Sequence, residues 1–319
     1  MALPLKSPVS PQLALSRRTL PDGQEWVYEV KLDGFRCLLF QDGDDLFLQS
    51  RNGRPLGRYF PELRFGPGRH VLDGEIVVRD SDGREDFDAL GQRIHPAQSR
   101  IQLLSEQTPA VFVAFDLLAQ DDKLWLDRPF AERRVALEAL AGRQEFGAVP
   151  LDLMMTAPTV HQAERWLLEA EGVIAKDRNA PYLPGERRGM VKVKRVRTID
   201  AVVAGWRPGK EPNTVGALIL GLYEGDEIRV VGHSSGLTQA EKRRLVGFLA
   251  PYETGERGTG DPSRWSGGRD LEWISLRPEL VVEVDFDHVS AGRIRHGAKL
   301  KRWREDKPPR DCTIEQLTA

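Results

Sequence analysis

The chain has 319 residues, 40% of them hydrophobic and 29% charged, which allows two soluble domains with separate cores. The formal net charge of −2 argues against a general polyanion binder, and Cys37 and Cys312 alone exclude a disulfide framework or a cysteine zinc site. No apolar run has the length of a signal peptide or a membrane span, so we expect a cytoplasmic protein with no membrane partner.

The first half of the chain predicts a β-rich domain with a few helices. Residues 1–24 show no periodicity and should form an extended arm packed on that domain. Strand patterns follow at 26–31, 35–40, 46–50, 70–79 (interrupted by Asp73-Gly74-Glu75), 110–118, 173–176 and 190–196. Amphipathic helices are expected after Pro129, with Arg133 on the solvated face, and over 160–170.

Near Arg197 the pattern changes to short strands separated by turn residues. They fall at 201–206, 217–223, 227–233 and 280–287, with a helix candidate at 238–249. This arrangement indicates a small β-barrel, so we place the domain boundary between residues 197 and 198. The fold class is therefore α+β.

Lys31 lies where one predicted strand ends and the turn Asp33-Gly34 begins. A lysine in this place is held rather than mobile. It can attack phosphorus only as a free amine, which burial or neighbouring cations would favour. An ordinary edge-strand lysine in a hairpin fits the short pattern Lys-x-Asp-Gly equally well.

Other charged residues sit in strand patterns where a solvated side chain is not expected. Asp116 interrupts an apolar run, so it needs a cation or metal beside it. Lys192 and Lys194 share one face of a strand, although such a pair is usually just exposed to water. Two segments, 186–210 and 293–310, each contain eight Lys or Arg residues against two acids. They favour a localised phosphate-binding surface, with two solvated charged faces as the ordinary alternative.

A glycine-rich segment at 205–211 raises the question of a P-loop. It reads Gly-Trp-Arg-Pro-Gly-Lys-Glu. The glycine spacing is wrong and no Ser or Thr follows the lysine, so a P-loop is excluded.

Seven short segments occur in one succession: 31–36, 50–53, 73–75, 115–116, 171–176, 192–194 and 304–307. Together they resemble the covalent nucleotidyltransferase family, and within it the compact bacterial ATP-dependent DNA ligases. The first segment fits the family's Lys-x-Asp-Gly-x-Arg motif, and the last fits its Arg-x-Asp-Lys motif. The resemblance spans nearly the whole chain. It implies an adenylation domain of antiparallel sheets with flanking helices at 1–197, followed by an OB-fold domain at 198–319.

The resemblance also implies which residues bind ATP. Lys31 would attack the α-phosphate and hold AMP through a phosphoramidate bond. Glu29 would lie near the adenine N6 edge, and Phe115 would stack on the base. Arg36, together with Glu75, would contact the ribose, whereas Arg51 would bind ribose or the 5′-phosphate of a nick.

Metal and phosphate ligands follow from the same resemblance. Glu75 and Glu171 would hold Mg²⁺ or Mn²⁺, which suits carboxylate and phosphate oxygens. The remaining cations would neutralise phosphate charge: Lys176, Lys192 and Lys194. A last group would orient the leaving pyrophosphate: Arg304, Asp306 and Lys307. One departure is Met190-Val191, where related ligases carry Trp-Leu or a similar pair.

The function implied is ATP-dependent sealing of 5′-phosphate and 3′-hydroxyl ends in nicked duplex DNA, in DNA repair. Expected partners are nicked DNA and a repair polymerase or end-binding protein; the chain would act as a monomer associated with the nucleoid. A capping guanylyltransferase and an RNA ligase are alternatives. A non-enzymatic alternative is a nick-binding module on an OB platform. An NAD-dependent ligase would carry a cysteine zinc module, which this chain lacks.

Overall fold

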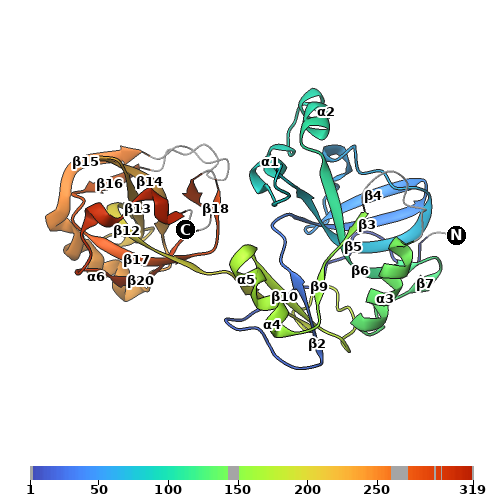
Figure 1. Cartoon of the computed structure of the whole chain (residues 1–319). Helices are drawn as coiled ribbons and strands as arrows, with labels where there is room; N and C mark the ends of the chain where they lie inside the picture. Colours follow the sequence, from blue (N-terminus) through green and yellow to red (C-terminus); the bar gives the residue numbers. More distant parts are fainter. Residues whose placement is uncertain (1–2, 143–150, 260–271, 291, 296, 318–319) are drawn as a thin grey trace. The chain divides into compact units, whose positions relative to one another are not determined.

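The computed structural model describes residues 3–142, 151–259, 272–290, 292–295 and 297–317. The chain divides into two compact units, Met1–Arg195 and Val196–Ala319, and each unit has a hydrophobic core of its own (Figure 1). The boundary expected between 197 and 198 falls within the first residues of strand β12 (Arg197–Pro208). The chain therefore enters the sheet of the second unit as soon as it leaves the first.

Two sheets form the first unit. One has the strand order β1-β11-β10-β2-β9. Its strands are β1 (Leu15–Ser16), β2 (Trp26–Val30), β9 (Thr156–Ala157), β10 (Gly172–Asp177) and β11 (Met190–Lys194). Its pairs are antiparallel except β1–β11, through which the predicted N-terminal arm joins the sheet in parallel.

The other sheet has the order β4-β3-β5-β6-β7, with β8 beside β6. Its strands are β3 (Phe35–Gly43), β4 (Asp45–Ser50), β5 (Gly68–Val78), β6 (Ala110–Gln120), β7 (Lys123–Leu124) and β8 (Leu151–Leu153). The interruption predicted at 73–75 does not break β5. It appears instead as a register shift between Asp73 and Gly74 in the pairing with β6.

Helices flank these sheets: α1 (Phe87–Gln92), α2 (Gln98–Gln107), α3 (Phe130–Ala141), α4 (Val160–Glu164) and α5 (Trp166–Glu169). α3 lies against the sheet that contains β6 (Figure 1). Leu137 and Leu140 of this helix are buried in the core under that sheet. The prediction of a solvated Arg133 was wrong, since this residue is 2% exposed and Val135 is 66% exposed. The cause is Asp116 on β6, whose carboxylate accepts two hydrogen bonds from the Arg133 guanidinium, at 2.7 and 3.0 Å.

The second unit is built on one antiparallel sheet of order β14-β13-β12-β16-β15, with β17 on β12 and β20 on β17. The strands of this sheet are β12, β13 (Val215–Glu224), β14 (Glu227–Ser234), β15 (Glu253–Thr259), β16 (Glu272–Leu276), β17 (Val281–Phe286) and β20 (Lys299–Trp303). β18 (Val289–Ser290) and β19 (Arg293–Ile294) form a separate two-stranded sheet. The first half of β12 pairs with β17 and a later part pairs with β16, so one long strand changes partner along the same edge. This is the OB-like region.

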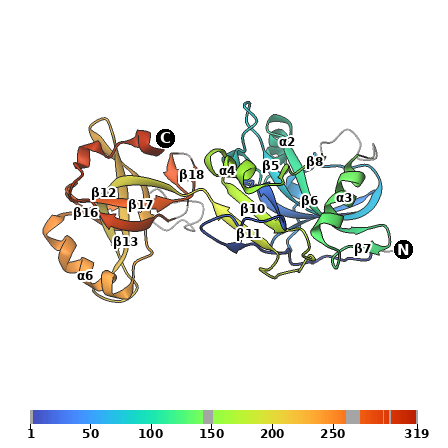
Figure 2. The same ribbon diagram turned by 60° about the horizontal axis from the view of Figure 1, so that its bottom comes forward.

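Helix α6 (Gln239–Leu249) covers part of that sheet (Figure 2). The predicted helix is confirmed. Thr238 caps it in a reciprocal capping box with Glu241, and Leu245 and Leu249 are buried in the core of the unit. Short 3₁₀ turns complete the described chain: Gly57–Tyr59, Ala250–Tyr252, Pro309–Asp311 and Ile314–Leu317. Among the described residues, no helix is long and apolar enough to cross a membrane.

Candidate functional site

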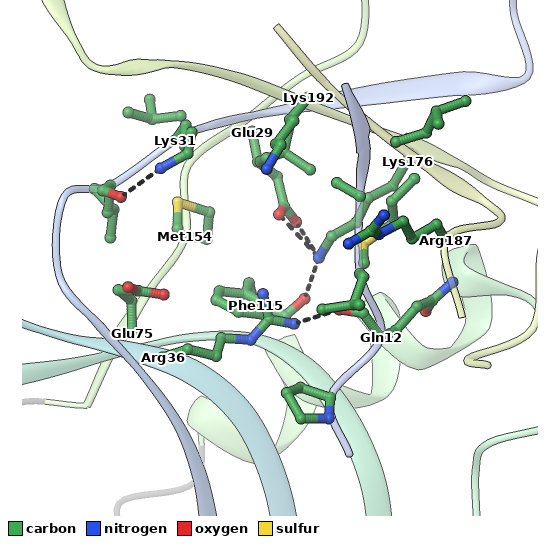
Figure 3. A pocket seen from close by; sticks show the side chains of 18 of the residues that line it. Gln12, Glu29, Lys31, Arg36, Glu75, Phe115, Met154, Lys176, Arg187 and Lys192 are labelled. Carbon is green, nitrogen blue, oxygen red and sulfur yellow. Dashed lines mark hydrogen bonds and ion pairs between the residues drawn. The ribbon is translucent and has the colours of Figure 1, made fainter. Parts of the chain in front are cut away.

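A cavity of about 410 Å³ in the first unit is lined by residues from both of its sheets (Figure 3). Eight residues predicted from the sequence line it: Glu29, Lys31, Arg36, Arg51, Glu75, Phe115, Lys176 and Lys192. They come from segments that are far apart along the chain. The fold therefore brings together most of the predicted site.

Lys31 follows β2 and is fixed through its backbone. Its N–H donates to the carbonyl oxygen of Gly172 at 2.9 Å. A Cβ on Gly172 would overlap the carbonyl oxygen of Val193, and one on Gly34 would overlap that of Ile76. Glycine is therefore required at both places for the loop that carries Lys31 to lie this close to its neighbours.

The Lys31 ammonium forms an ion pair with Glu171. The other oxygen of the same carboxylate lies 3.1 Å from Nζ of Lys194. Glu171 and Lys194 thus belong to the site through Lys31, although neither lines the cavity. Burial raises the pKa of Glu171, but the two ammonium groups outweigh this effect and hold the pKa below its ordinary value.

Positive charge is crowded at this end of the cavity. Burial lowers the pKa of Lys192, and repulsion from Lys194, Lys31 and Arg51 lowers it further. Glu171 is the one acid that opposes this shift among the causes that act on Lys192. A bound phosphate chain would relieve the repulsion, so this end suits the phosphates of a nucleotide.

The other end of the cavity offers an aromatic face beside a buried carboxylate. Nζ of Lys176 lies 2.9 Å from Oε2 of Glu29 and donates to the carbonyl oxygen of Phe115 at 3.1 Å. It also lies 4.6 Å from the centroid of the Phe115 ring. Lys176 therefore fixes both Glu29 and Phe115. The Glu29 carboxylate largely neutralises the charge of Lys176. A flat ring next to a hydrogen-bond acceptor suits a nucleobase with an exocyclic amino group.

Arg36 is held in place by Asp73, which sequence reasoning did not assign to the site. The guanidinium donates to both oxygens of Asp73 at 2.6 Å, and the Tyr182 hydroxyl donates to Oδ2 at 2.6 Å. The guanidinium carbon lies 4.4 Å from the centroid of the Phe115 ring. The sequence could have indicated Asp73, because a carboxylate inside an apolar strand requires a cation or hydrogen-bond donors beside it.

The N-terminal arm forms part of the wall, which the sequence did not indicate. The Gln12 N–H donates to the Tyr182 hydroxyl at 3.0 Å, and the Gln12 carbonyl accepts from Arg36 at 3.4 Å. These contacts use the backbone and leave no trace in a residue pattern. Met154, Arg187 and the departing residue Met190 also line the cavity.

Glu75 is the lining residue that best fits a metal ligand. Within the described chain its carboxylate has no hydrogen bond or ion pair, and burial raises its pKa to about 7 despite Arg36 and Lys31. The raised pKa shows that the neighbouring cations do not fully compensate the burial of this carboxylate, and a bound metal ion would supply the missing positive charge. No group of three His, Cys, Asp or Glu residues able to hold a metal occurs among the described residues. Mg²⁺ takes one or two carboxylates together with substrate phosphates, so Glu75 is a candidate ligand for it.

The last predicted group lies in the second unit. Arg304 forms ion pairs with Asp306 at 2.9 Å and Asp200 at 2.8 Å. Nζ of Lys307 lies 3.9 Å from Asp311. These side chains lie on a segment that follows β20, and ion pairs with acidic residues of the same unit hold them in place.

A lysine at the end of a strand, in a cavity between sheets with a cationic end and an aromatic end, defines a covalent nucleotidyltransferase. Family models extend this result. The ATP dependent DNA ligase domain matches residues 11–194, and the ATP dependent DNA ligase C terminal region matches residues 211–307. The chain belongs to the ATP-dependent DNA ligases.

Similar proteins agree with this assignment. The chain is 44% identical over 338 residues to DNA ligase C1 of Mycolicibacterium smegmatis, covering 99% of this chain and 96% of that relative. It is 31% identical to the multifunctional non-homologous end joining protein LigD of Pseudomonas aeruginosa, with 98% of this chain matched to 37% of that longer protein. A solved structure of mycobacterial DNA ligase D with ATP and MES has 30% identity and a TM-score of 0.54, covering 96% and 98% of the two chains.

These matches confirm the predictions of a compact bacterial DNA ligase, of a nucleotidyltransferase domain followed by an OB-like region, and of ATP use by the family. They decide against the guanylyltransferase, the RNA ligase and the non-enzymatic module. The roles of individual residues remain predictions.

Proposed function

We propose that the cavity of the first unit binds ATP and that Lys31 is the nucleophile. The observation that carries this is the position of Lys31, fixed at the cationic end of the cavity beside Lys192, Lys194 and the unpaired carboxylate of Glu75. Phosphoryl and nucleotidyl transfer depend on positioning and on positive charge where the transition state gathers negative charge. This end of the cavity supplies both.

In the first step the Lys31 amine attacks the α-phosphorus. A nitrogen–phosphorus bond forms, the bond to the β-phosphate oxygen breaks, and pyrophosphate leaves. Glu171 holds the Lys31 ammonium in place through their ion pair, and the amine attacks once its proton has passed to water. Lys192 and Lys194 neutralise the phosphates, and Arg304, Asp306 and Lys307 orient the pyrophosphate.

The base and sugar are held at the other end. Phe115 stacks on adenine and Glu29 accepts a hydrogen bond from its amino group, with Lys176 keeping both in place. Arg36 and Arg51 contact the ribose, and Arg51 can instead take the 5′-phosphate of the nick. Glu75 and Glu171 would hold Mg²⁺ or Mn²⁺, which would add positive charge to the reacting phosphates.

The substrate we propose is nicked duplex DNA. AMP passes from Lys31 to the 5′-phosphate, and the 3′-hydroxyl then attacks that phosphate and releases AMP. We further propose that the chain acts as a monomer in DNA repair in the bacterial cytoplasm, together with a repair polymerase or an end-binding protein. The support is its similarity to LigD, whose name describes end joining.

The experiment is sealing of a duplex with one 5′-labelled nick in the presence of Mg²⁺. We expect a full-length product with ATP and little with GTP, because Glu29 accepts from an amino group where guanine carries a carbonyl oxygen. The same nick between RNA ends tests the competing substrate. Equal sealing with GTP, or sealing of the RNA nick alone, would refute the proposal.

A further inference from the structure

A second cavity, of about 600 Å³, lies in the second unit. Its lining comes from the end of β12, the loop into β13, the end of β14 and the first turns of α6. The segment 205–211, whose spacing excludes a P-loop, contributes Arg207, Pro208, Gly209, Lys210 and Glu211 to it. Nothing in the nucleotide site described above uses these residues.

The backbone beneath this cavity is tightly fixed. Arg207 pairs with Ala217 and Pro208 pairs with Val215, which leaves Gly216 as the extra residue of a β-bulge. A Cβ on Gly216 would lie 2.7 Å from the carbonyl oxygen of Pro208. Bulges of this kind bend a strand and redirect its side chains. The close approach of Gly216 to Pro208 therefore fixes the direction in which the Arg207 side chain leaves the strand.

The cations of this cavity have no anion to pair with in the described chain. Nε of Arg207 is buried without a hydrogen-bond partner, and Arg207, Lys210 and Lys242 form no ion pair there. The lining includes one acid, Glu211, and its carboxylate lies 3.5 Å from the Arg243 guanidinium. Burial lowers the pKa of both Arg207 and His233, as expected for groups that lack a compensating negative charge.

We propose that this cavity binds a backbone phosphate of the duplex DNA substrate, with Arg207 donating to the phosphate oxygens and Lys210 and Lys242 adding charge on either side. A planar guanidinium on a fixed frame suits a phosphate diester, and such contacts position a protein on DNA without reading its sequence. The proposal rests on the DNA ligase function. Free ATP or pyrophosphate presents the same chemistry and is the competing source of the anion.

The test measures DNA binding separately from adenylylation. Fluorescence polarisation with a nicked duplex carrying a 5′-hydroxyl, which cannot be sealed, gives the dissociation constant over a range of KCl concentrations. The variants are Arg207→Gln, which keeps a polar side chain, and a double variant of Lys210→Ala at an exposed position and Lys242→Ala at a half-buried one. Arg277→Ala is the matched control, because this arginine of the same unit already pairs with Glu279 at 2.7 Å.

The logarithm of the DNA association constant falls linearly with the logarithm of the salt concentration. Each lost phosphate contact should make that slope less steep by about 0.9. We expect a fall of about one for Arg207→Gln and about two for the lysine double variant, with unchanged slope for Arg277→Ala and unchanged formation of the AMP adduct in all variants. Unchanged slopes in folded variants, checked by circular dichroism, would overturn the proposal. Slower adduct formation at unchanged slope would also overturn it, since a free nucleotide would then be the ligand. If the wild type itself neither bound nor sealed nicked DNA, the proposed function would fail instead.

Discussion

Replacing Asp116 by alanine should destabilise the first unit strongly, because it would leave the Arg133 charge buried. Both side chains are 2% exposed, and their two hydrogen bonds measure 2.7 and 3.0 Å. In the variant, the hydrogen-bond acceptors left to Arg133 among the described residues would be the carbonyl oxygens of Arg128 at 2.5 Å and Ala180 at 3.1 Å, both neutral. Arginine cannot release its proton in a protein, so the charge stays. Removing one member of a buried ion pair costs about 3–5 kcal/mol.

The assay is urea unfolding of full-length protein, followed by circular dichroism and tryptophan fluorescence. Asp82→Ala is the control, because its pair with Arg84 is 3.4 Å long and both side chains are mostly exposed; it should change the unfolding free energy by less than about 0.5 kcal/mol. Asp116→Leu combined with Arg133→Met replaces both charges by apolar groups and should recover most of the loss. A cost below about 1 kcal/mol for Asp116→Ala would refute the reasoning, since that is the value of an exposed pair.

Two further predictions concern the reaction itself. Glu171→Ala should leave a folded protein whose sealing rate falls by about 10²-fold, because Glu171 positions the Lys31 nucleophile and a misplaced reacting group costs about that much. Steady-state sealing at several Mg²⁺ concentrations checks it, and an unchanged rate and metal dependence would remove Glu171 from the site. Arg304→Ala should slow formation of the AMP adduct but should not slow sealing by enzyme that already carries AMP. The second step is measured on nicked DNA without ATP. Equal loss in both steps would show that this segment does not act on pyrophosphate.

The sequence predicted the parts of the site whose chemistry is carried by side chains in strand patterns. The strand pattern placed Lys31 between two strands. It also placed Lys192 and Lys194 on one face, because strands alternate their side chains. The turn at Asp33-Gly34 was visible too, since these are turn-forming residues. Eight of the predicted residues line the cavity.

What the sequence did not predict depends on contacts between distant segments. Helical periodicity placed Arg133 in solvent. The sequence indicated that Asp116 requires a cation, but it did not indicate that Arg133, on another element, is that cation. Gln12 lines the cavity through backbone hydrogen bonds, which any residue could make. The way Arg207 is presented became apparent only once the bulge at Gly216 of β13 was known.

The central claim is that Lys31 carries AMP. The most direct measurement is incubation of the protein with α-labelled ATP and Mg²⁺, separation on a denaturing gel, and mapping of the labelled peptide. We predict one label, on Lys31, that is absent from Lys31→Ala and retained by Lys123→Ala, an exposed lysine on β7. Label on any other residue, or label that persists in Lys31→Ala, would contradict the account.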